Sequence, residues 1–284
     1  MWIRLVVYFG VLPLLYFGLC WYLASGYVKP PRNVAEWMPS SMRAVIIDHE
    51  PHDLVAWASR SLATGEPEHD TVVILVHGYG ANRDHWPLLI ELLEQRAEIV
   101  APAMHGQDAS LAEMVGFGPG EAAEIASAAR WARAQYEGDV KVVLFGVSLG
   151  GSACWLAAGE HPELFDAVVT EGAFATLESA SDEFMKSAFR GGSGLMRPVI
   201  WFANIQGGID PSKVRPVDGA KKWSGPALVI HGTEDAMFGT HNAEKLAAAS
   251  GADLWLVEGL HHAQLAGDDP EGLADRILGV ASGR

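Results

Sequence analysis

The chain opens with a continuous apolar run, in which no charged residue stands between Leu5 and Val28. A helix of this length crosses the ~30 Å of hydrocarbon in a bilayer. The core of a signal peptide is typically about 7 to 15 residues, although Ala24 and Gly26 would suit a cleavage site. We predict a single transmembrane anchor over residues 1–28, with a cleaved signal segment of a secreted or periplasmic protein as the alternative. Positive charges flank both ends about equally, so they indicate no side of the membrane.

A different pattern follows a proline-rich linker over residues 29–42. Residues 43–48 and 54–61 have the composition of two short strands joined by a turn, and from residue 71 apolar β-rich runs alternate with segments of helical period. Nearly continuous hydrophobic strands are typical of a parallel sheet covered by helices on both faces. One α/β domain over residues 43–284 is expected, with strands at 71–76, 98–102, 140–145, 166–170, 227–230 and 254–257, and helices at 83–95, 120–136, 149–159, 242–249 and 270–281.

Residues 177–216 interrupt this alternation. They comprise a polar helical segment at 179–189, a glycine-rich break at 191–194 and an apolar stretch at 195–205. A partly apolar insertion with a glycine hinge can act as a lid over a site. A packed helix followed by a surface loop explains the same pattern, so both interpretations stay open.

Composition excludes some functions. The formal net charge is −15, which argues against nucleic acid as a partner because phosphate binding needs a basic surface. Eleven histidines form no HExxH or HxxxH pair, and two cysteines, Cys20 and Cys154, form no metal-binding spacing. We therefore expect neither a metal nor another cofactor. Nothing in the sequence indicates the oligomeric state.

The segment Gly146-Val147-Ser148-Leu149-Gly150 lies between a predicted strand and a predicted helix. A serine at such a sharp turn stands above the sheet edge, and its strained backbone needs glycine two residues away on either side. The following helix directs its N-terminal amides toward the serine and stabilises negative charge there. Ser148 is therefore the candidate nucleophile.

A second glycine-rich turn, His77-Gly78-Tyr79-Gly80, follows the predicted strand at 71–76. Its glycines allow backbone amides to approach a substrate oxygen closely. We expect the N–H groups of Tyr79 and Leu149 to form an oxyanion hole. His77 is interpreted as a residue that supports the loop rather than one that takes part in chemistry.

Serine needs a base and an orienting carboxylate, which must come from later strands. Asp235 follows the strand at 227–230 and His262 follows the strand at 254–257, so the order Ser, Asp, His is the one expected when the nucleophile stands at such a turn. Neighbours compete for both roles: Glu234 and Glu171 for the acid, and His261 for the base. We favour Asp235 and His262.

These motifs resemble those of the α/β-hydrolase superfamily, and within it the bud-emergence serine hydrolases, which include membrane-anchored members. The similarity covers about residues 43–282 and rests on HGYGAN, GVSLGG, HGTED and the final histidine. In that family the base follows a Gly-x-Gly-His pattern. Here His261 replaces the second glycine, so His262 takes the family position. Ala101 and Met104 stand where relatives usually carry Asp and Arg.

The resemblance implies an α/β-hydrolase fold and a serine hydrolase acting through an acyl-enzyme, with esters or thioesters favoured over amides. A peptidase or amidase of the same fold is the alternative within enzymes, and a non-catalytic binding scaffold is the alternative outside them. The anchor suggests a small-molecule or lipid-like ester as substrate. Several apolar side chains could line an acyl pocket or simply pack in the core: Met185, Met196, Met237, Phe189, Trp201, Phe202 and Phe238.

Overall fold

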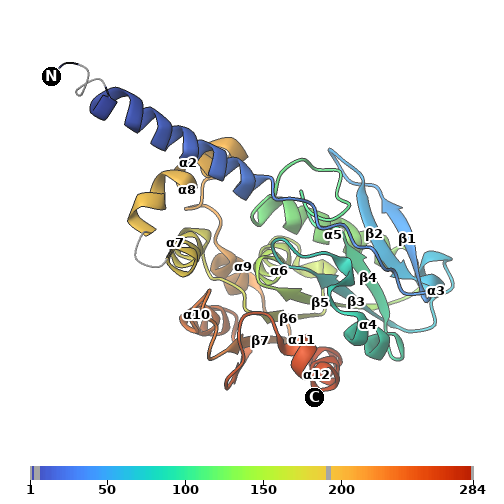
Figure 1. The fold of residues 1–284 in the computed structure, drawn as a ribbon. Coiled ribbons are helices and arrows are strands. Elements are labelled where there is room, and N and C mark those ends of the chain that lie inside the picture. The colour runs from blue at the N-terminus through green and yellow to red at the C-terminus, as the bar shows by residue number, and fades with distance from the viewer. Residues whose placement is uncertain (1, 3–6, 190–192, 283–284) are drawn as a thin grey trace.

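The computed structural model describes residues 2, 7–189 and 193–282. At its centre is an eight-stranded sheet in the order β1-β2-β4-β3-β5-β6-β7-β8 (Figure 1). Within the described residues, β2 alone runs against its neighbours. The mostly parallel sheet with a leading hairpin is therefore confirmed. The strands are β1 (Met42–Ile47), β2 (Leu54–Ser59), β3 (Thr71–Val76), β4 (Glu98–Pro102), β5 (Lys141–Val147), β6 (Ala167–Glu171), β7 (Ala227–Gly232) and β8 (Asp253–Val257).

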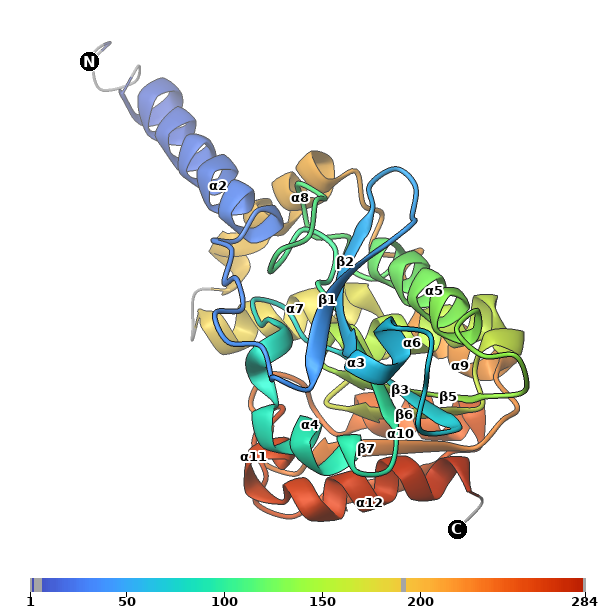
Figure 2. The same ribbon diagram turned by 90° about the vertical axis from the view of Figure 1, so that its right-hand side faces the viewer.

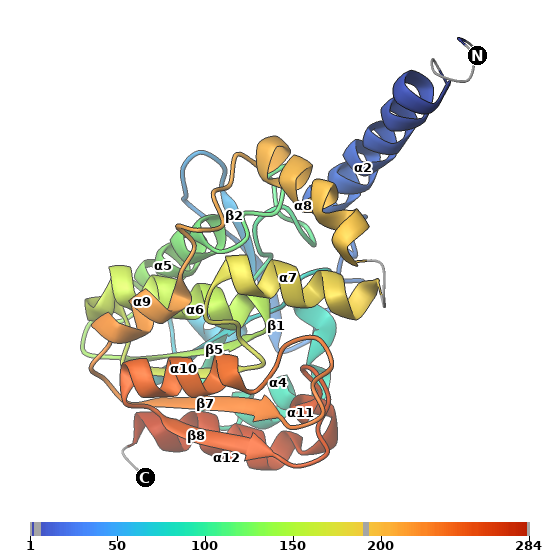
Figure 3. The same ribbon diagram turned by 90° about the vertical axis from the view of Figure 1, so that its left-hand side faces the viewer.

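Helices cover both faces of the sheet, as Figures 2 and 3 show. One face carries α5 (Pro119–Arg133), α6 (Leu149–Glu160), α9 (Pro216–Lys222) and α10 (His241–Ser250). The other carries α4 (Pro87–Glu94), the short α11 (Leu265–Asp268) and α12 (Pro270–Ala281). Both faces of the central strands are consequently buried, which explains their continuous apolar sequence.

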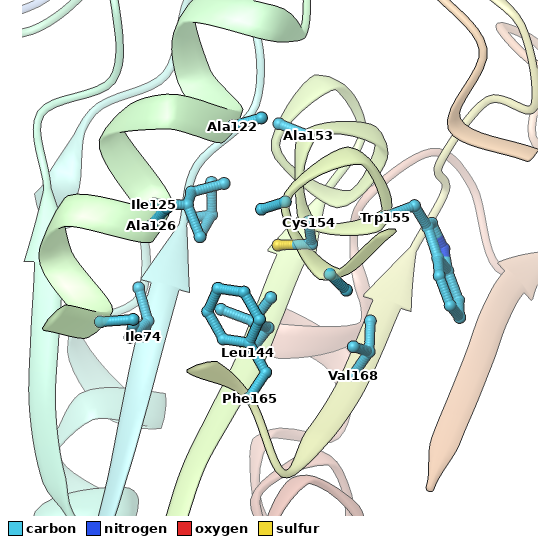
Figure 4. Close-up of a cluster of buried hydrophobic side chains, with 14 of the residues drawn as sticks. Ile74, Ala122, Ile125, Ala126, Leu144, Ala153, Cys154, Trp155, Phe165 and Val168 are labelled. Atoms are coloured by element: carbon cyan, nitrogen blue, oxygen red, sulfur yellow. The ribbon is translucent and has the colours of Figure 1, made fainter. Parts of the chain in front are cut away.

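Small side chains let the helices approach the sheet closely. In Figure 4 the methyl groups of Ala122 and Ala153 face each other between α5 and α6, above Ile74 and Leu144 of the sheet. All four side chains are at most 1% exposed. This packing holds α6, the helix that follows Ser148, firmly against β5.

Some helix boundaries differ from the sequence prediction. The helix expected at 83–95 is a 3-10 turn, η2 (Arg83–His85), followed by α4, which begins at Pro87. Proline disfavours helical backbone in the residue before it, and Trp86 accordingly has φ −126° and ψ 56°. The short helices α3 (Arg60–Ala63), η3 (Pro162–Leu164), α9 and α11 were not predicted, because a helix of few turns carries too little periodicity to recognise.

The N-terminal segment forms the π-helical turn η1 (Val7–Val11) and the helix α2 (Leu12–Val28), which points away from the sheet in all three views (Figures 1–3). Val7–Val28 is long and apolar enough to span a membrane, but a signal sequence can have the same length and hydropathy. One face of its last turns is nevertheless buried, since Cys20, Ala24 and Val28 are at most 1% exposed. The helix end is thus packed into the rest of the protein.

Two helices fill the predicted insertion between β6 and β7. They are α7 (Leu177–Ala188) and α8 (Ser193–Gly207), and the expected glycine-rich break lies partly outside the described residues. Thr176 caps α7 by accepting a hydrogen bond from the Ser179 amide. α8 lies beside α2 (Figure 1). The lid function of residues 177–216 stays a prediction.

Candidate active site

Ser148 sits at the turn between β5 and α6, with φ 55° and ψ −120°. L-residues rarely adopt this conformation, so the surrounding packing must hold it. A Cβ atom at Gly150 would lie 2.4 Å from the Val76 carbonyl oxygen, and one at Gly146 would lie 2.6 Å from Cys154 Sγ. Glycine is therefore needed at both positions, as the sequence pattern indicated.

Ser148, His262 and Asp235 form a continuous hydrogen-bonded chain. His262 Nε2 lies 2.9 Å from Ser148 Oγ, and His262 Nδ1 lies 2.6 Å from Asp235 Oδ2. The three residues follow β5, β8 and β7, whose carboxyl ends lie at one edge of the sheet. The arrangement puts a base within reach of a hydroxyl and a carboxylate behind the base.

The Asp235 carboxylate is held from several directions. Its Oδ1 accepts hydrogen bonds from the amides of Met237 (2.8 Å) and Phe238 (2.9 Å), and its Oδ2 lies 3.3 Å from His231 Nε2. Burial by itself raises the pKa of this carboxyl, but the hydrogen bond from His262, the charge of that imidazole and the two amides outweigh it. The net effect lowers the pKa of Asp235, which keeps it ionised.

The imidazole of His262 is confined by two neighbours. Its ring meets Phe238 edge to face, with centroids 5.3 Å apart and an interplanar angle of 80°. On another side lies the backbone of Gly172, where a Cβ atom would be 3.2 Å from the ring carbon Cε1. Gly172 also has φ +61°, so its position both needs glycine and brings β6 against the base.

The competing residues occupy other positions. The side chains of Glu234 and His261 are 63% and 59% exposed, and His261 Nδ1 lies 3.1 Å from the Glu234 carbonyl oxygen. The Glu171 carboxylate instead accepts a hydrogen bond from the Leu265 amide (2.9 Å). Burial raises the pKa of Glu171 to about 7, partly offset by backbone hydrogen bonds. In this geometry Asp235, rather than either glutamate, contacts the imidazole that reaches Ser148.

The turn after β3 lies directly beside Ser148. A Cβ atom at Gly78 would lie 3.2 Å from Ser148 Cβ, and Gly80, at φ +72°, donates its amide to Gln107 Oε1 at 2.6 Å. Among the described residues, the amides of Tyr79 and Leu149 have no hydrogen-bond acceptor. Both are therefore free to bind a substrate oxygen. Gln107, which fixes this turn, was not singled out by the sequence analysis.

His77 is buried under this turn. Its Nδ1 lies 3.0 Å from the Gly78 carbonyl oxygen, and its Nε2 accepts the Met104 amide at 3.2 Å. Burial lowers the pKa of His77 to about 4, so the ring is neutral, with its proton on Nδ1. These contacts fit the interpretation of His77 as a support for the loop.

An apolar pocket opens next to Ser148. Aromatic side chains from widely separated segments line it: Tyr27, Tyr79, Phe117, Phe174, Phe184 and Phe238. The ring of Tyr27 stacks on Phe117 with centroids 4.9 Å apart, so the end of α2 forms part of the wall. Of the apolar candidates named from the sequence, Met237 and Phe238 line this pocket; Met185, Met196, Phe189, Trp201 and Phe202 do not. The sequence left pocket lining and core packing open for all seven residues, and these five lie on or at the end of α7 and α8.

Within the described residues, no three His, Cys, Asp or Glu side chains gather in a way that could hold a metal ion.

Comparison with known proteins agrees with the observed fold. A family model described as the α/β-hydrolase fold matches residues 71–200. No curated protein sequence matches the chain. An esterase of Pyrococcus furiosus has 19% identity and a TM-score of 0.74 over 90% of this chain and 97% of its own. A membrane phospholipase A, described as a bacterial virulence factor, has 17% identity and a TM-score of 0.65 over 99% and 96%.

Est1E from Butyrivibrio proteoclasticus, whose structure holds ferulic acid, has 16% identity and a TM-score of 0.61 over 84% of this chain and 100% of its own. The fold is therefore that of the α/β hydrolases, as the sequence motifs implied. The narrower resemblance to bud-emergence hydrolases stays a prediction.

Proposed function

We propose that the protein is a membrane-anchored serine hydrolase that cleaves carboxylic ester or thioester bonds through an acyl-enzyme. The observation that carries this proposal is the hydrogen-bonded chain from Ser148 Oγ through His262 to Asp235, at a turn where Ser148 has a left-handed φ. A strained serine within reach of an oriented imidazole is the arrangement that activates this nucleophile.

In the first half of the reaction, Ser148 Oγ attacks the substrate carbonyl carbon as His262 Nε2 takes the hydroxyl proton. The carbonyl oxygen becomes an oxyanion, which the amides of Tyr79 and Leu149 bind. Asp235 holds the Nδ1 proton of His262 and stabilises the imidazolium. Collapse of the intermediate breaks the bond to the leaving alcohol or thiol, which receives the proton from His262 Nε2.

In the second half, water attacks the acyl-serine ester while His262 takes its proton, and Ser148 is released with that proton returned. These two steps balance in atoms and protons without a cofactor. Each amide of the oxyanion hole contributes ~3 kcal/mol to transition-state stabilisation in comparable enzymes. Free amides at Tyr79 and Leu149 support this step, because they need not break an existing hydrogen bond to bind the oxyanion.

The nature of the pocket supports an acyl group as the part of the substrate next to Ser148. Its wall is almost entirely apolar and aromatic, which suits an alkyl or aryl chain better than a polar peptide. The esterase and phospholipase neighbours make ester and lipid substrates plausible. An ester of an amphiphilic or lipid-like acid is therefore the substrate class we favour.

Retention of the N-terminal helix is supported by its contacts. Cys20 and Ala24, which a cleavage would remove, are at most 1% exposed, and Gln206 of α8 donates a hydrogen bond to the Trp21 carbonyl at 3.0 Å. Cleavage after Ala24 or Gly26 would remove part of this buried helix end and expose apolar surface. The anchor interpretation is favoured over the signal interpretation for this reason.

A fluorophosphonate probe tests the nucleophile. Wild-type protein should be labelled and Ser148→Ala should not. Ser181→Ala is the matched control, since Ser181 lines the same pocket from α7, whereas His262 forms its hydrogen bonds with Asp235 and Ser148. Absence of labelling on wild type, or equal labelling of Ser148→Ala, would end the hydrolase proposal and favour a binding scaffold.

The substrate class has its own test. Hydrolysis of p-nitrophenyl esters from acetate to long chains should give a kcat/KM that rises with chain length until the pocket is filled. A steep preference for acetate would contradict the lipid-like substrate while leaving the serine hydrolase intact.

A further inference from the structure

The outward face of α8 is apolar. Leu195, Trp201 and Ile205 are 67%, 59% and 52% exposed, and Trp201 and Ile205 stand one helical turn apart. The single charged residue in this helix, Arg197, is also exposed and lies one turn before Trp201, and both border a hollow with Asp182 of α7. A helix on a water-facing surface normally turns polar residues outward and apolar ones inward. The exposed side of α8 therefore suits a surrounding other than water.

α8 lies against α2 through specific contacts. The ring of Phe202 meets Trp21 edge to face at 5.4 Å between centroids, and Gln206 donates a hydrogen bond to the Trp21 carbonyl at 3.0 Å. Nearer the other end of α8, the Tyr16 hydroxyl donates to the Leu195 carbonyl. The two helices remain side by side in Figures 1 and 3. Whatever surrounds α2 between Tyr16 and Trp21 must also surround the outer face of α8.

The length of α2 decides what that surrounding is. The part of the N-terminal helix that precedes its contacts with α8, from Val7 to Leu15, spans only about 14 Å at 1.5 Å per residue, short of the ~30 Å hydrocarbon core. A helix needs about 20 apolar residues to cross the hydrocarbon core. The uncharged run starts at Leu5, so its twentieth residue is Ala24. The membrane must then extend to the level of Trp21, where α8 packs.

From this we propose that α8 lies against the membrane beside α2, with Leu195, Trp201 and Ile205 turned toward lipid. The inference rests on the proposed membrane anchor. Leu14, Leu15 and Tyr22 of α2 are also exposed and apolar or aromatic. Tryptophan suits the interface because its ring is amphipathic, and Arg197 can extend its guanidinium to the headgroups.

Spin labelling tests this placement without reference to catalysis. The two native cysteines are buried, so single cysteines introduced at exposed positions can be labelled selectively. Labels on α8 are introduced by Leu195→Cys, Trp201→Cys and Ile205→Cys. The matched control is Lys245→Cys on α10. The full-length protein is reconstituted in phosphatidylcholine vesicles, and each label is exposed to molecular oxygen, which concentrates in lipid, or to a water-soluble nickel chelate.

The three α8 labels should relax at least several times faster with oxygen than with the nickel chelate, and the Lys245 label should show the opposite order. Equal nickel accessibility at Trp201 and Lys245 would overturn the proposal. Spin–spin broadening at α8 that disappears on dilution with unlabelled protein would also overturn it, because a second copy of the chain would then cover this face.

An activity measurement separates this inference from the proposed function. Ile205→Lys should reduce hydrolysis of an ester carried in vesicles by roughly tenfold or more while leaving hydrolysis of soluble p-nitrophenyl acetate unchanged. Equal activity of Ile205→Lys and wild type on the vesicle ester would contradict the membrane role of α8. Inactivity of wild type on both esters would instead count against the hydrolase, and the spin-label result would still decide where α8 lies.

Discussion

The hydroxyl group of Tyr79 donates a hydrogen bond to the backbone carbonyl of Tyr27, with 2.8 Å between the oxygens. This bond joins the turn that carries a proposed oxyanion donor to the end of the N-terminal helix. The two rings also lie close, with centroids 5.6 Å apart. The N-terminal helix and the candidate active site are therefore one structural unit.

Tyr27→Ala should reduce activity on long-chain esters. The substitution keeps the backbone carbonyl that Tyr79 binds but removes an aromatic wall of the pocket. Loss of apolar contact worth about 1.5 kcal/mol corresponds to roughly a tenfold fall in kcat/KM for p-nitrophenyl octanoate. Activity on the acetate should change less than about twofold, since a short acyl group does not reach the wall.

Tyr22→Ala is the control for this change. Tyr22 lies on the same helix but is 74% exposed and does not line the pocket. An equal loss in both variants would point to the helix as a whole rather than to the pocket wall.

Asp235→Asn should lower kcat by ~10³- to 10⁴-fold. An asparagine can keep its oxygen on the amides of Met237 and Phe238, so the loop should hold its shape. Its NH₂ group would then face His262 Nδ1 and force the imidazole proton onto Nε2. That tautomer cannot accept the proton of Ser148.

Glu234→Gln should retain wild-type kcat, because this exposed carboxylate does not contact His262. Steady-state kinetics on one soluble ester compares both variants directly. The assignment of the acid is wrong if Glu234→Gln loses as much activity as Asp235→Asn.

Glu171 should make the folded protein less stable as pH rises. Burial raises its pKa from 4.5 to about 7, so between these values the unfolded chain releases a proton that the folded chain retains. The stabilising contribution is fully present below pH 4.5 and is lost as pH rises to about 7. A shift of this size corresponds to about 3 kcal/mol of unfolding free energy.

Glu171→Gln removes this titration while its amide oxygen can still accept the Leu265 hydrogen bond. Guanidinium unfolding in mild detergent at pH 4.5, 6 and 7.5 should show wild type losing about 3 kcal/mol more than the variant over this range. Glu258→Gln, at an exposed position after β8, is the control. Parallel profiles for wild type and Glu171→Gln would refute the prediction.

Gly150→Ala should disrupt the turn at Ser148. The new methyl group would meet the carbonyl oxygens of Val76 and His77 at 2.4 and 2.5 Å, and backbone atoms cannot move aside cheaply. We expect a loss of about 2 kcal/mol, equivalent to a fall of roughly 5 °C in Tm, together with loss of fluorophosphonate labelling.

Gly138→Ala provides the comparison, since no atom lies within 4 Å of the position that its new methyl group would take. Thermal unfolding of the two variants under the same conditions distinguishes them. Wild-type stability and labelling in Gly150→Ala would show that the close approach of β3 to α6 is not required.

Much of this architecture follows from local sequence patterns. The apolar runs at 71–76 and 98–102 coincide with β3 and β4, and the helical period at 270–281 coincides with α12. The glycines around Ser148 indicated a tight strand-to-helix turn, and the order Ser148, Asp235, His262 followed from positions just after predicted strands. Such features depend on residues close together in the chain, so the amino-acid sequence by itself determined them.

The tertiary structure decided which neighbours meet. His261 and His262 are adjacent in sequence, yet one ring reaches Ser148 and the other is exposed, because the loop after β8 presents a single side chain to the sheet edge. The pocket wall likewise combines Tyr27, Phe117 and Phe184 from three distant segments, none of which carries a motif. Contacts of this kind form only when distant segments of the chain fold together, so the periodicity of the sequence cannot predict them.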